Sequence, residues 1–288
     1  MSVGTASTEA AAPPAEVAPP AEAASRTGNA VRRRARRTRL LVLLTQLALL
    51  AVLLGLWEYA TYADRQAAFM FGRPTAIFGF LVTMASDGSL FRDTWVTGME
   101  TVLGFVVGNV LGTVLGLALW YSPFVSRVVS PFVVALGSIP IIALAPMVII
   151  WFGTGLASKI AMATLSVVVV ALVTSYKGAT SVDPDQINLM RTLGARKWQI
   201  FNRLVVPASL TDIFAGLKLT VGFALIGAII GEFMSSSEGL GHAIFKAGSL
   251  YIIPKVLASL VATIALALAL TFVVGKLEKR LMPWRRDL

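Results

Sequence analysis

The chain has 288 residues, of which 56% are hydrophobic and only 14% are charged. Ordinary soluble domains carry roughly 25% charged residues, so this composition is typical of a protein embedded in a membrane. The absence of cysteine excludes disulfides, thiolate-bound metals and thiol catalysis, and the single histidine, His242, excludes a site with several histidine ligands. The net charge of +10 indicates either nucleic-acid binding or basic loops beside a membrane, so the positions of the charges decide.

Residues 1–39 form a segment of their own character. They are rich in alanine and proline up to Ser25, and an arginine cluster ends at Arg39. This composition predicts a disordered cytoplasmic tail followed by a membrane domain at 40–288. The arginine cluster is compatible with nucleic-acid binding. Its position beside an apolar run favours an anchor on anionic membrane lipid, so no nucleic-acid partner is expected.

Six apolar segments are long enough to cross a bilayer, which takes about 20 residues in a helix. They cover residues 40–57, 101–120, 128–152, 160–176, 213–231 and 256–275. The third contains Pro131, Pro140 and Pro146, so a kink or break is expected within it. The pattern predicts an all-α fold, a polytopic bundle of about six transmembrane helices.

Lysine and arginine gather on one side of these segments. With the N-terminus in the cytoplasm, 18 of the 25 basic residues lie in inner segments and six in outer loops. Cytoplasmic loops carry an excess of basic residues, so both termini are predicted to be cytoplasmic. Lys218, near the inner end of the fifth segment, is expected to reach the membrane surface with its ammonium group.

Two segments carry small residues at a spacing of four. These residues are Gly104, Gly108, Gly112 and Gly116 in the second segment, and Gly227 and Gly231 in the fifth. Residues four apart lie on one helix face, where they let a neighbouring backbone approach closely. We expect close helix packing there, and the functional alternative is a smooth face on which helices move during transport.

Ionisable residues are nearly absent from the predicted span interiors, because Glu58, Glu100 and Glu232 fall at span ends. This absence counts against an ion-coupled secondary carrier, which normally needs buried charge. The polar residues at depth include Asn109, Ser138, Ser166 and Thr220. We expect them to form hydrogen bonds between helices, and the functional alternative is that they line a substrate pathway.

The sequence shows no nucleotide-binding loop, no metal-ligand cluster and no catalytic arrangement. We therefore expect no enzymatic activity and no cofactor in this chain, so that energy for transport comes from another subunit. A membrane enzyme or an assembly scaffold is the alternative from a different class. A scaffold would give no solute flux.

One long inner segment, residues 177–212, has the pattern of folded structure. Asp183 and Pro184 favour a helix start and Gly194 a helix stop, which predicts a short helix over 184–193. A second helix is predicted over 196–206, ended by Pro207. The pair is suited either to docking a partner or to lying in the lipid headgroups as an interfacial pair.

Gly194 is followed by nine residues and then by Leu204-Val205-Val206-Pro207. This spacing resembles the cytoplasmic-loop motif of ABC-importer permeases, which runs Glu-Ala-Ala, three residues, glycine, nine residues and Ile-x-Leu-Pro. Asn188-Leu189-Met190 stands where Glu-Ala-Ala would fall, so the first part of the motif departs from the family's pattern.

Further motifs extend the resemblance over residues 71–283. They are Gly72-Arg73-Pro74-Thr75, Ile139-Pro140, Leu144-Ala145-Pro146, Trp151-Phe152-Gly153-Thr154-Gly155, Ser181-Val182-Asp183-Pro184, Gly231-Glu232 and Gly239-Leu240-Gly241. Together they are similar to the nitrate, sulfonate and taurine branch of binding-protein-dependent permeases. That branch also includes importers of thiamine precursors, aromatic acids and other small organic anions.

The resemblance implies a type I ABC-importer permease fold in the bacterial cytoplasmic membrane. It also implies a division of labour among a second permease copy, two cytoplasmic ATPase subunits that bind ATP and Mg, and an external binding protein that delivers the solute. The ATPase-coupling residues that it implies are Asp183, Pro184, Gly194, Ala195, Trp198, Phe201, Leu204 and Pro207. Gly194 supplies the turn, and three apolar residues of the second helix act as anchors in the partner's groove.

Overall fold

The structure is a computed structural model that describes the backbone of residues 21–282 and the side chains of residues 38 and 40–282. This part of the chain is helical, without strands. It contains five helices that are long and apolar enough to cross a membrane, or up to seven spans if each of two bent helix pairs counts as one. Five of the six predicted spans lie within the five long helices, which confirms a multi-pass helical bundle.

The described residues divide into two units, with the boundary between Tyr59 and Ala60. The first is built on α1 (Ala21–Ala63), whose apolar stretch Leu40–Ala63 contains the first predicted span. The helix already begins at Ala21, so residues 21–39 are helical where a disordered tail was predicted. Alanine and arginine are strong helix formers, which lets a helix nucleated in the apolar run extend through them. Residues 1–20, also predicted to be disordered, lie outside the described residues.

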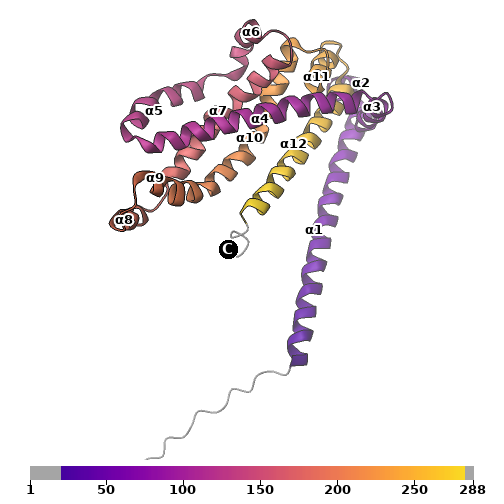
Figure 1. The fold of residues 1–288 in the computed structure, drawn as a ribbon. Helices are drawn as coiled ribbons and strands as arrows, with labels where there is room; N and C mark the ends of the chain where they lie inside the picture. The colour runs from indigo at the N-terminus through magenta and orange to yellow at the C-terminus, as the bar shows by residue number, and fades with distance from the viewer. Residues whose placement is uncertain (1–20, 283–288) are drawn as a thin grey trace, which may run out of the picture. The chain divides into compact units, whose positions relative to one another are not determined.

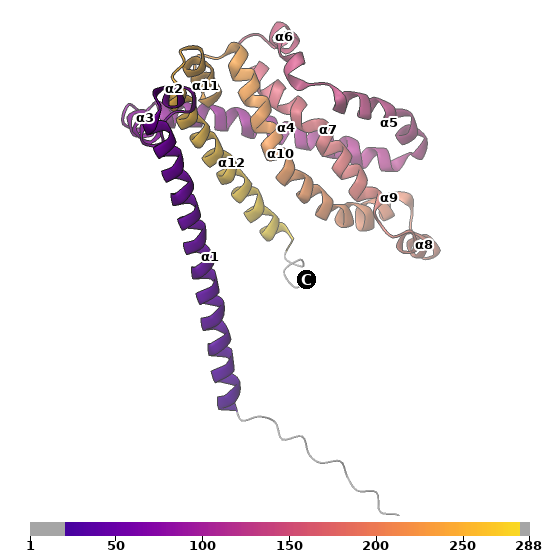
Figure 2. The same cartoon turned by 180° about the vertical axis from the view of Figure 1, so that it is seen from behind.

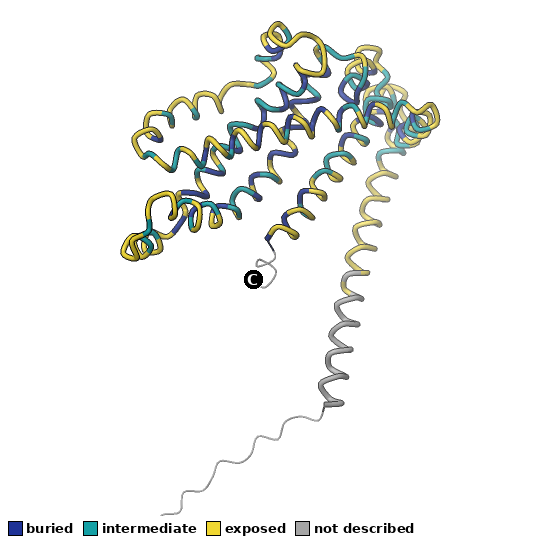
Figure 3. Tube along the Cα trace, in the orientation of Figure 1, coloured by how far each residue is buried: buried dark blue, intermediate teal, exposed yellow. Residues whose placement is uncertain are grey.

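Three long helices form the centre of the second unit: α4 (Ser89–Tyr121), α7 (Leu156–Thr180) and α10 (Val206–Ser235). Both views of the ribbon show α7 beside α4 and α10 (Figures 1 and 2). Buried positions concentrate on these helices (Figure 3). The long helix α12 (Ile253–Leu281) packs against α10 and against the short α11 (Leu240–Ser249).

The glycines spaced by four let these helices approach closely. A Cβ at Gly108 would lie 2.8 Å from the Val167 side chain, and a Cβ at Gly227 would lie 2.7 Å from the Met162 carbonyl oxygen. Gly104, Gly112, Gly116 and Gly231 are also buried, each against α7. All six predicted packing glycines therefore lie at contacts between α7 and its two long neighbours.

The predicted third span is not one straight helix. It corresponds to α5 (Pro123–Ser138) and α6 (Ile141–Phe152), which meet at an angle of 95°. The break falls at Pro140, which lacks a backbone N–H and stands at the N-cap of α6. Pro131 and Pro146 lie inside α5 and α6 without ending them.

A second bent pair occupies a stretch that the sequence placed in an outer loop. It comprises α2 (Arg65–Phe71) and α3 (Pro74–Ser86), which meet at 44°. Gly72 at the junction has φ +67°, a left-handed conformation that suits glycine. Pro74 then begins α3 in the position where proline fits a helix best.

The inner segment folds as α8 (Pro184–Thr192), α9 (Lys197–Ile200) and the π-helical turn η1 (Phe201–Val205). The prediction that Pro207 ends the second helix is wrong, because the helix continues from Lys197 to Ser235. In the π-helical turn the Val206 N–H reaches back five residues to the Phe201 carbonyl. Proline is tolerated in the first turn of α10, so Pro207 passes into the helix without breaking it.

Candidate functional site

The loop between α7 and α10 begins with a capped helix. The Asp185 N–H donates to Asp183 Oδ1 at 2.9 Å, and Pro184 occupies the first helical turn. The Asp183 side chain thus satisfies one of the N–H groups that a helix start leaves unpaired. Asp183 and Pro184 hold the start of α8 in the position that the sequence predicted.

Gly194 closes α8 with a left-handed turn, at φ +79°. Its N–H donates to the Arg191 carbonyl at 2.9 Å, and the Ala195 N–H donates to the Met190 carbonyl at 3.0 Å. The hydrogen bond from Ala195 to Met190 is the six-to-one bond of a Schellman motif. No atom lies within 4 Å of a Cβ placed at Gly194, so backbone conformation alone favours glycine there.

The apolar side chains of this loop divide into two groups. Trp198 is 59% exposed and stacks on Phe201 with ring centroids 5.7 Å apart. Phe201 itself is half-buried, with its ring 5.6 Å from that of Trp120 on α4. Leu204 is half-buried in the apolar cluster around Ile200 and Val205. Of the three proposed anchors, only Trp198 stands free on the surface.

Two leucines that the sequence reasoning did not single out lie exposed on the same loop. Leu189 on α8 is 61% exposed, and Leu193 at its end is 73% exposed. The helical pattern of α8 carries a signal for them, since Ile187 and Met190 pack inward and leave Leu189 and Leu193 outside. We call Leu189, Leu193 and Trp198 the exposed apolar surface of the loop.

The polar residues proposed for a substrate pathway do not come together. Thr220 on α10 donates to Asn109 Oδ1 on α4 at 3.0 Å, and both side chains are buried. Ser166 is buried in α7 and donates to the Met162 carbonyl at 2.9 Å. Ser138 is exposed at the end of α5 and donates to the Val134 carbonyl of its own helix. Only Asn109 and Thr220 form a pair.

The far end of the same bundle holds buried charges that the sequence reasoning placed elsewhere. Glu100 and Glu232 have no exposed surface, and Lys159 is 8% exposed. The sequence assigned the two glutamates to span ends and the lysine to an outer loop. Helices α4 and α7 begin at Ser89 and Leu156, before their apolar runs, so Glu100 and Lys159 are enclosed within the bundle.

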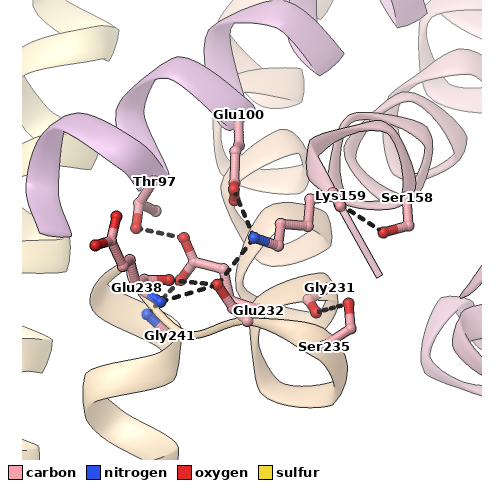
Figure 4. Close-up of polar contacts among 12 residues, drawn as sticks. Thr97, Glu100, Ser158, Lys159, Gly231, Glu232, Ser235, Glu238 and Gly241 are labelled. Atoms are coloured by element: carbon pink, nitrogen blue, oxygen red, sulfur yellow. Dashed lines mark hydrogen bonds and ion pairs between the residues drawn. The ribbon is translucent and has the colours of Figure 1, made fainter. Parts of the chain in front are cut away.

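These residues are joined by direct contacts (Figure 4). The Thr97 hydroxyl donates to Glu232 Oε1 at 2.6 Å, and the Gly241 N–H donates to Glu232 Oε2. Lys159 Nζ lies 3.2 Å from Glu100 Oε1. We call Asp93, Thr97, Glu100, Lys159 and Glu232 the buried charge cluster. It joins α4, α7 and α10 at the end opposite the α8–α9 loop.

The cluster also holds the turn that leads into α11. The Gly239 N–H donates to Asp93 Oδ1 at 3.2 Å, and the Leu240 N–H donates to Thr97 Oγ1 at 2.8 Å. A Cβ at Gly241 would lie 2.5 Å from Glu232 Oε2 and 3.0 Å from the Ile229 carbonyl oxygen, so glycine lets this turn approach the carboxylate closely. Among the described residues, no group of His, Cys, Asp and Glu side chains is arranged to hold a metal ion.

Comparison with known protein families gives a match over residues 108–283 to the binding-protein-dependent transport system inner membrane component. The chain is 31% identical over 238 residues to a probable ABC transporter permease protein of Haemophilus influenzae, covering 83% of this chain and 96% of that protein. It is also 31% identical to the riboflavin transport system permease protein RibX of Chloroflexus aurantiacus, covering 82% and 88% of the two chains. Other relatives are named as formylaminopyrimidine, aliphatic sulfonate and taurine permeases.

The fold is similar to that of a solved importer. A chain of the MetNI methionine ABC transporter in an inward-facing conformation matches 68% of this chain and 97% of its own length. The TM-score is 0.62 and the sequence identity is 20%, so this likeness concerns the fold alone.

Proposed function

Since the chain belongs to the family of binding-protein-dependent transport system inner membrane components, and is a permease subunit of an ABC importer working with ATPase and binding-protein partners, we propose that it imports a small solute of the nitrate, sulfonate and taurine class. Relatives named for aliphatic sulfonates and taurine are 27% and 25% identical and support this class. The second candidate is a heteroaromatic compound. It is favoured by the higher identities, 31% and 36%, of the relatives named for riboflavin and formylaminopyrimidine.

The loop between α7 and α10 is proposed to contact the ATPase subunit. Its exposed apolar surface of Leu189, Leu193 and Trp198 supports this role, because exposed leucine and tryptophan side chains suit an interface more than a solvated loop. The capped start at Asp183 and the turn at Gly194 give this surface a defined shape. ATP and Mg are proposed to bind in the partner ATPase.

The continuous helix from Lys197 to Ser235 gives the loop a mechanical link to the bundle. Because no break separates α9 from α10, a push on Trp198 is transmitted along a rigid helix past α7 and α4. Closure of two ATPase subunits would rotate this helix as part of a rigid body and switch the access of the pathway. This continuous helix is the observation that supports the proposal that ATP hydrolysis in a partner subunit drives transport by this chain.

The assembly is proposed to contain two copies of this permease, two ATPase subunits and one external binding protein. Both termini are proposed to lie in the cytoplasm, since that orientation places 18 of 25 basic residues on the inner side. The α8–α9 loop then faces the cytoplasmic ATPase, and the buried charge cluster lies near the outer side.

Reconstitution of the permease with its ATPase and binding protein in liposomes tests the function. A solute screen should find a compound that raises ATP hydrolysis and accumulates inside only when ATP is present. Collapse of the ion gradients with ionophores should leave uptake unchanged. Uptake that depends on an ion gradient and ignores ATP would instead show an ion-coupled carrier. Stimulation by sulfonates or by heteroaromatic compounds separates the two solute classes.

A further inference from the structure

The buried charge cluster brings two carboxyl groups and one ammonium group together at the meeting point of three helices. Glu100 comes from α4, Lys159 from α7 and Glu232 from α10. Both glutamates are fully buried, and Lys159 is nearly so. Taking an isolated charge out of water into such a site is very unfavourable, so the protonation of this group must balance its charge.

The buried group of Glu100, Glu232 and Lys159 has one negative charge in excess if both glutamates are ionised. Arg92 lies 3.9 Å from Asp93 and 3.7 Å from Glu238, at the partly exposed rim of the cluster. The remaining cation, Lys159, is paired with Glu100 at 3.2 Å. Glu100 and Glu232 together therefore face one positive charge.

The hydrogen bonds of the two carboxyl groups differ. Glu232 accepts from the Thr97 hydroxyl and from the Gly241 N–H, which suits an ionised carboxylate. Within the described part of the chain, neither oxygen of Glu100 accepts a hydrogen bond, although Oε1 forms the ion pair with Lys159. Thr97, which donates to Glu232, stands one helical turn before Glu100 on α4, and Gly231, next to Glu232 on α10, packs against Lys159. The two carboxyl groups therefore share one buried cation, and this group is neutral only if one carboxyl group carries a proton.

We propose that Glu100 and Glu232 bind one proton between them at neutral pH, so that the cluster is a proton-binding site at the end of the bundle opposite the α8–α9 loop. The shared proton brings the charge of the group formed by Glu100, Glu232 and Lys159 to zero.

Other charged side chains stand on the elements packed against the cluster. On α11 these are His242 and Lys246, and on α12 it is Lys255, which interacts with Asp87. α6, which also packs against α10, carries no titratable side chain. The cation in direct contact with these two glutamates is Lys159, whose Nζ lies 3.2 Å from Glu100 Oε1.

Release of this proton would leave two adjacent carboxylates facing one lysine. Their repulsion acts between α4 and α10, and the Glu232 carboxylate also holds the turn at Gly241. An unfolded chain has free glutamates that are ionised at neutral pH, so the folded chain binds one proton more. Stability therefore falls as pH rises, by up to about tenfold in the folding equilibrium per pH unit.

Infrared spectroscopy of the purified full chain in lipid nanodiscs tests the proposal without any transport assay. At neutral pH, exposed carboxyl groups are ionised, so a protonated-carboxyl C=O band that shifts in D2O reports a buried acid. We expect this band in the wild type and its loss in both Glu100→Gln and Glu232→Gln, because each variant leaves one carboxylate beside Lys159. The control Glu238→Gln changes a carboxylate that is 46% exposed and should keep the band.

Absence of the band from the wild type overturns the proposal, and this measurement needs no variant to fold. Survival of the band in either glutamine variant also overturns it, because the proton would then belong to a single residue. As a second readout, the thermal midpoint of the wild type and of Glu238→Gln should fall between about pH 6 and about pH 9. The thermal midpoint of Glu100→Gln should depend less on pH over this range. An unchanged pH dependence in that variant contradicts the shared site.

Discussion

Thr220 on α10 donates a hydrogen bond of 3.0 Å to Asn109 on α4, and both side chains are buried in the bundle. Asn109 is further fixed because its Nδ2 donates to the Phe105 carbonyl at 2.8 Å. The amide therefore has a partner on its own helix and a partner on the neighbouring helix. An arrangement of this kind stabilises helix packing and leaves little capacity to bind a solute.

Substituting Thr220→Val and Asn109→Leu should therefore lower stability and leave solute affinity unchanged. Hydrogen bonds between transmembrane helices contribute about 0.6 kcal/mol on average and up to about 1.7 kcal/mol, which is the coupling expected from a double-mutant cycle. Unfolding of the wild type, the two single variants and the double variant in detergent measures this coupling energy. Ser138→Ala is the control, since Ser138 is exposed and bonds within its own helix. A raised KM for uptake with unchanged stability would show that the pair lines the pathway.

Gly108→Ala should destabilise the bundle, because the new Cβ would lie 2.8 Å from the Val167 side chain and 2.9 Å from the Thr164 carbonyl oxygen. Overpacking of this kind costs about 1–3 kcal/mol. Gly222→Ala on α10 is the matched control, since no atom lies within 4 Å of its Cβ. The control should be neutral or stabilise the helix by about 0.5–1 kcal/mol. Equal thermal midpoints for the two variants would contradict close packing of α4 on α7.

The positions of the long helices follow from the apolar runs, whereas the buried charges do not. A hydropathy pattern treats Glu100, Lys159 and Glu232 as boundaries, since each stands at the edge of an apolar run. They are buried because they meet one another, and such a meeting depends on how three helices pack. The Gly241 N–H at the Glu232 carboxylate is likewise a tertiary contact that no local pattern contains.

The loop between α7 and α10 shows the same division between local and non-local causes. Asp183 and Gly194 act through neighbouring backbone, so capping and turn preferences located both ends of α8. Phe201 was predicted to face a partner, and its half-burial depends on Trp120, which is far away in the sequence. At Pro207 the rule that proline ends a helix fails, because the preceding π-helical turn shifts the hydrogen bonds.

Trp198→Ala should weaken binding of the ATPase subunit by about tenfold or more, because a large exposed aromatic side chain at an interface is a common source of binding energy. Its stacking on Phe201 contributes about 0.5–1.5 kcal/mol, so stability should change only modestly. The control Trp95→Ala removes a tryptophan that is 72% exposed on α4. Co-purification with the ATPase measures both variants. Equal loss of ATPase from the two variants would refute a specific role for Trp198.

Gly194→Val should uncouple ATP hydrolysis from transport. The φ of +79° is unfavourable for a residue with a Cβ, by about 1–2 kcal/mol, and the strain for a β-branched side chain is greater. A penalty of that size lowers the population of the intact turn by a factor of about 5–30. We expect solute-stimulated ATPase activity and uptake of the reconstituted complex to fall, while basal ATP hydrolysis by the ATPase continues.

Gly194→Asn separates backbone strain from side-chain bulk at the same position. Asparagine enters the left-handed region several-fold more readily than most residues, and the space around Gly194 is open, so this variant should retain most of the coupling. Gly194→Ala should fall between asparagine and valine, because it adds the least bulk and carries the conformational penalty. If coupling instead declines in the order of side-chain volume, the partner surface packs directly on Gly194, and the turn conformation is not the reason for glycine. The ratio of solute transported to ATP hydrolysed, measured for all three variants, distinguishes these two outcomes.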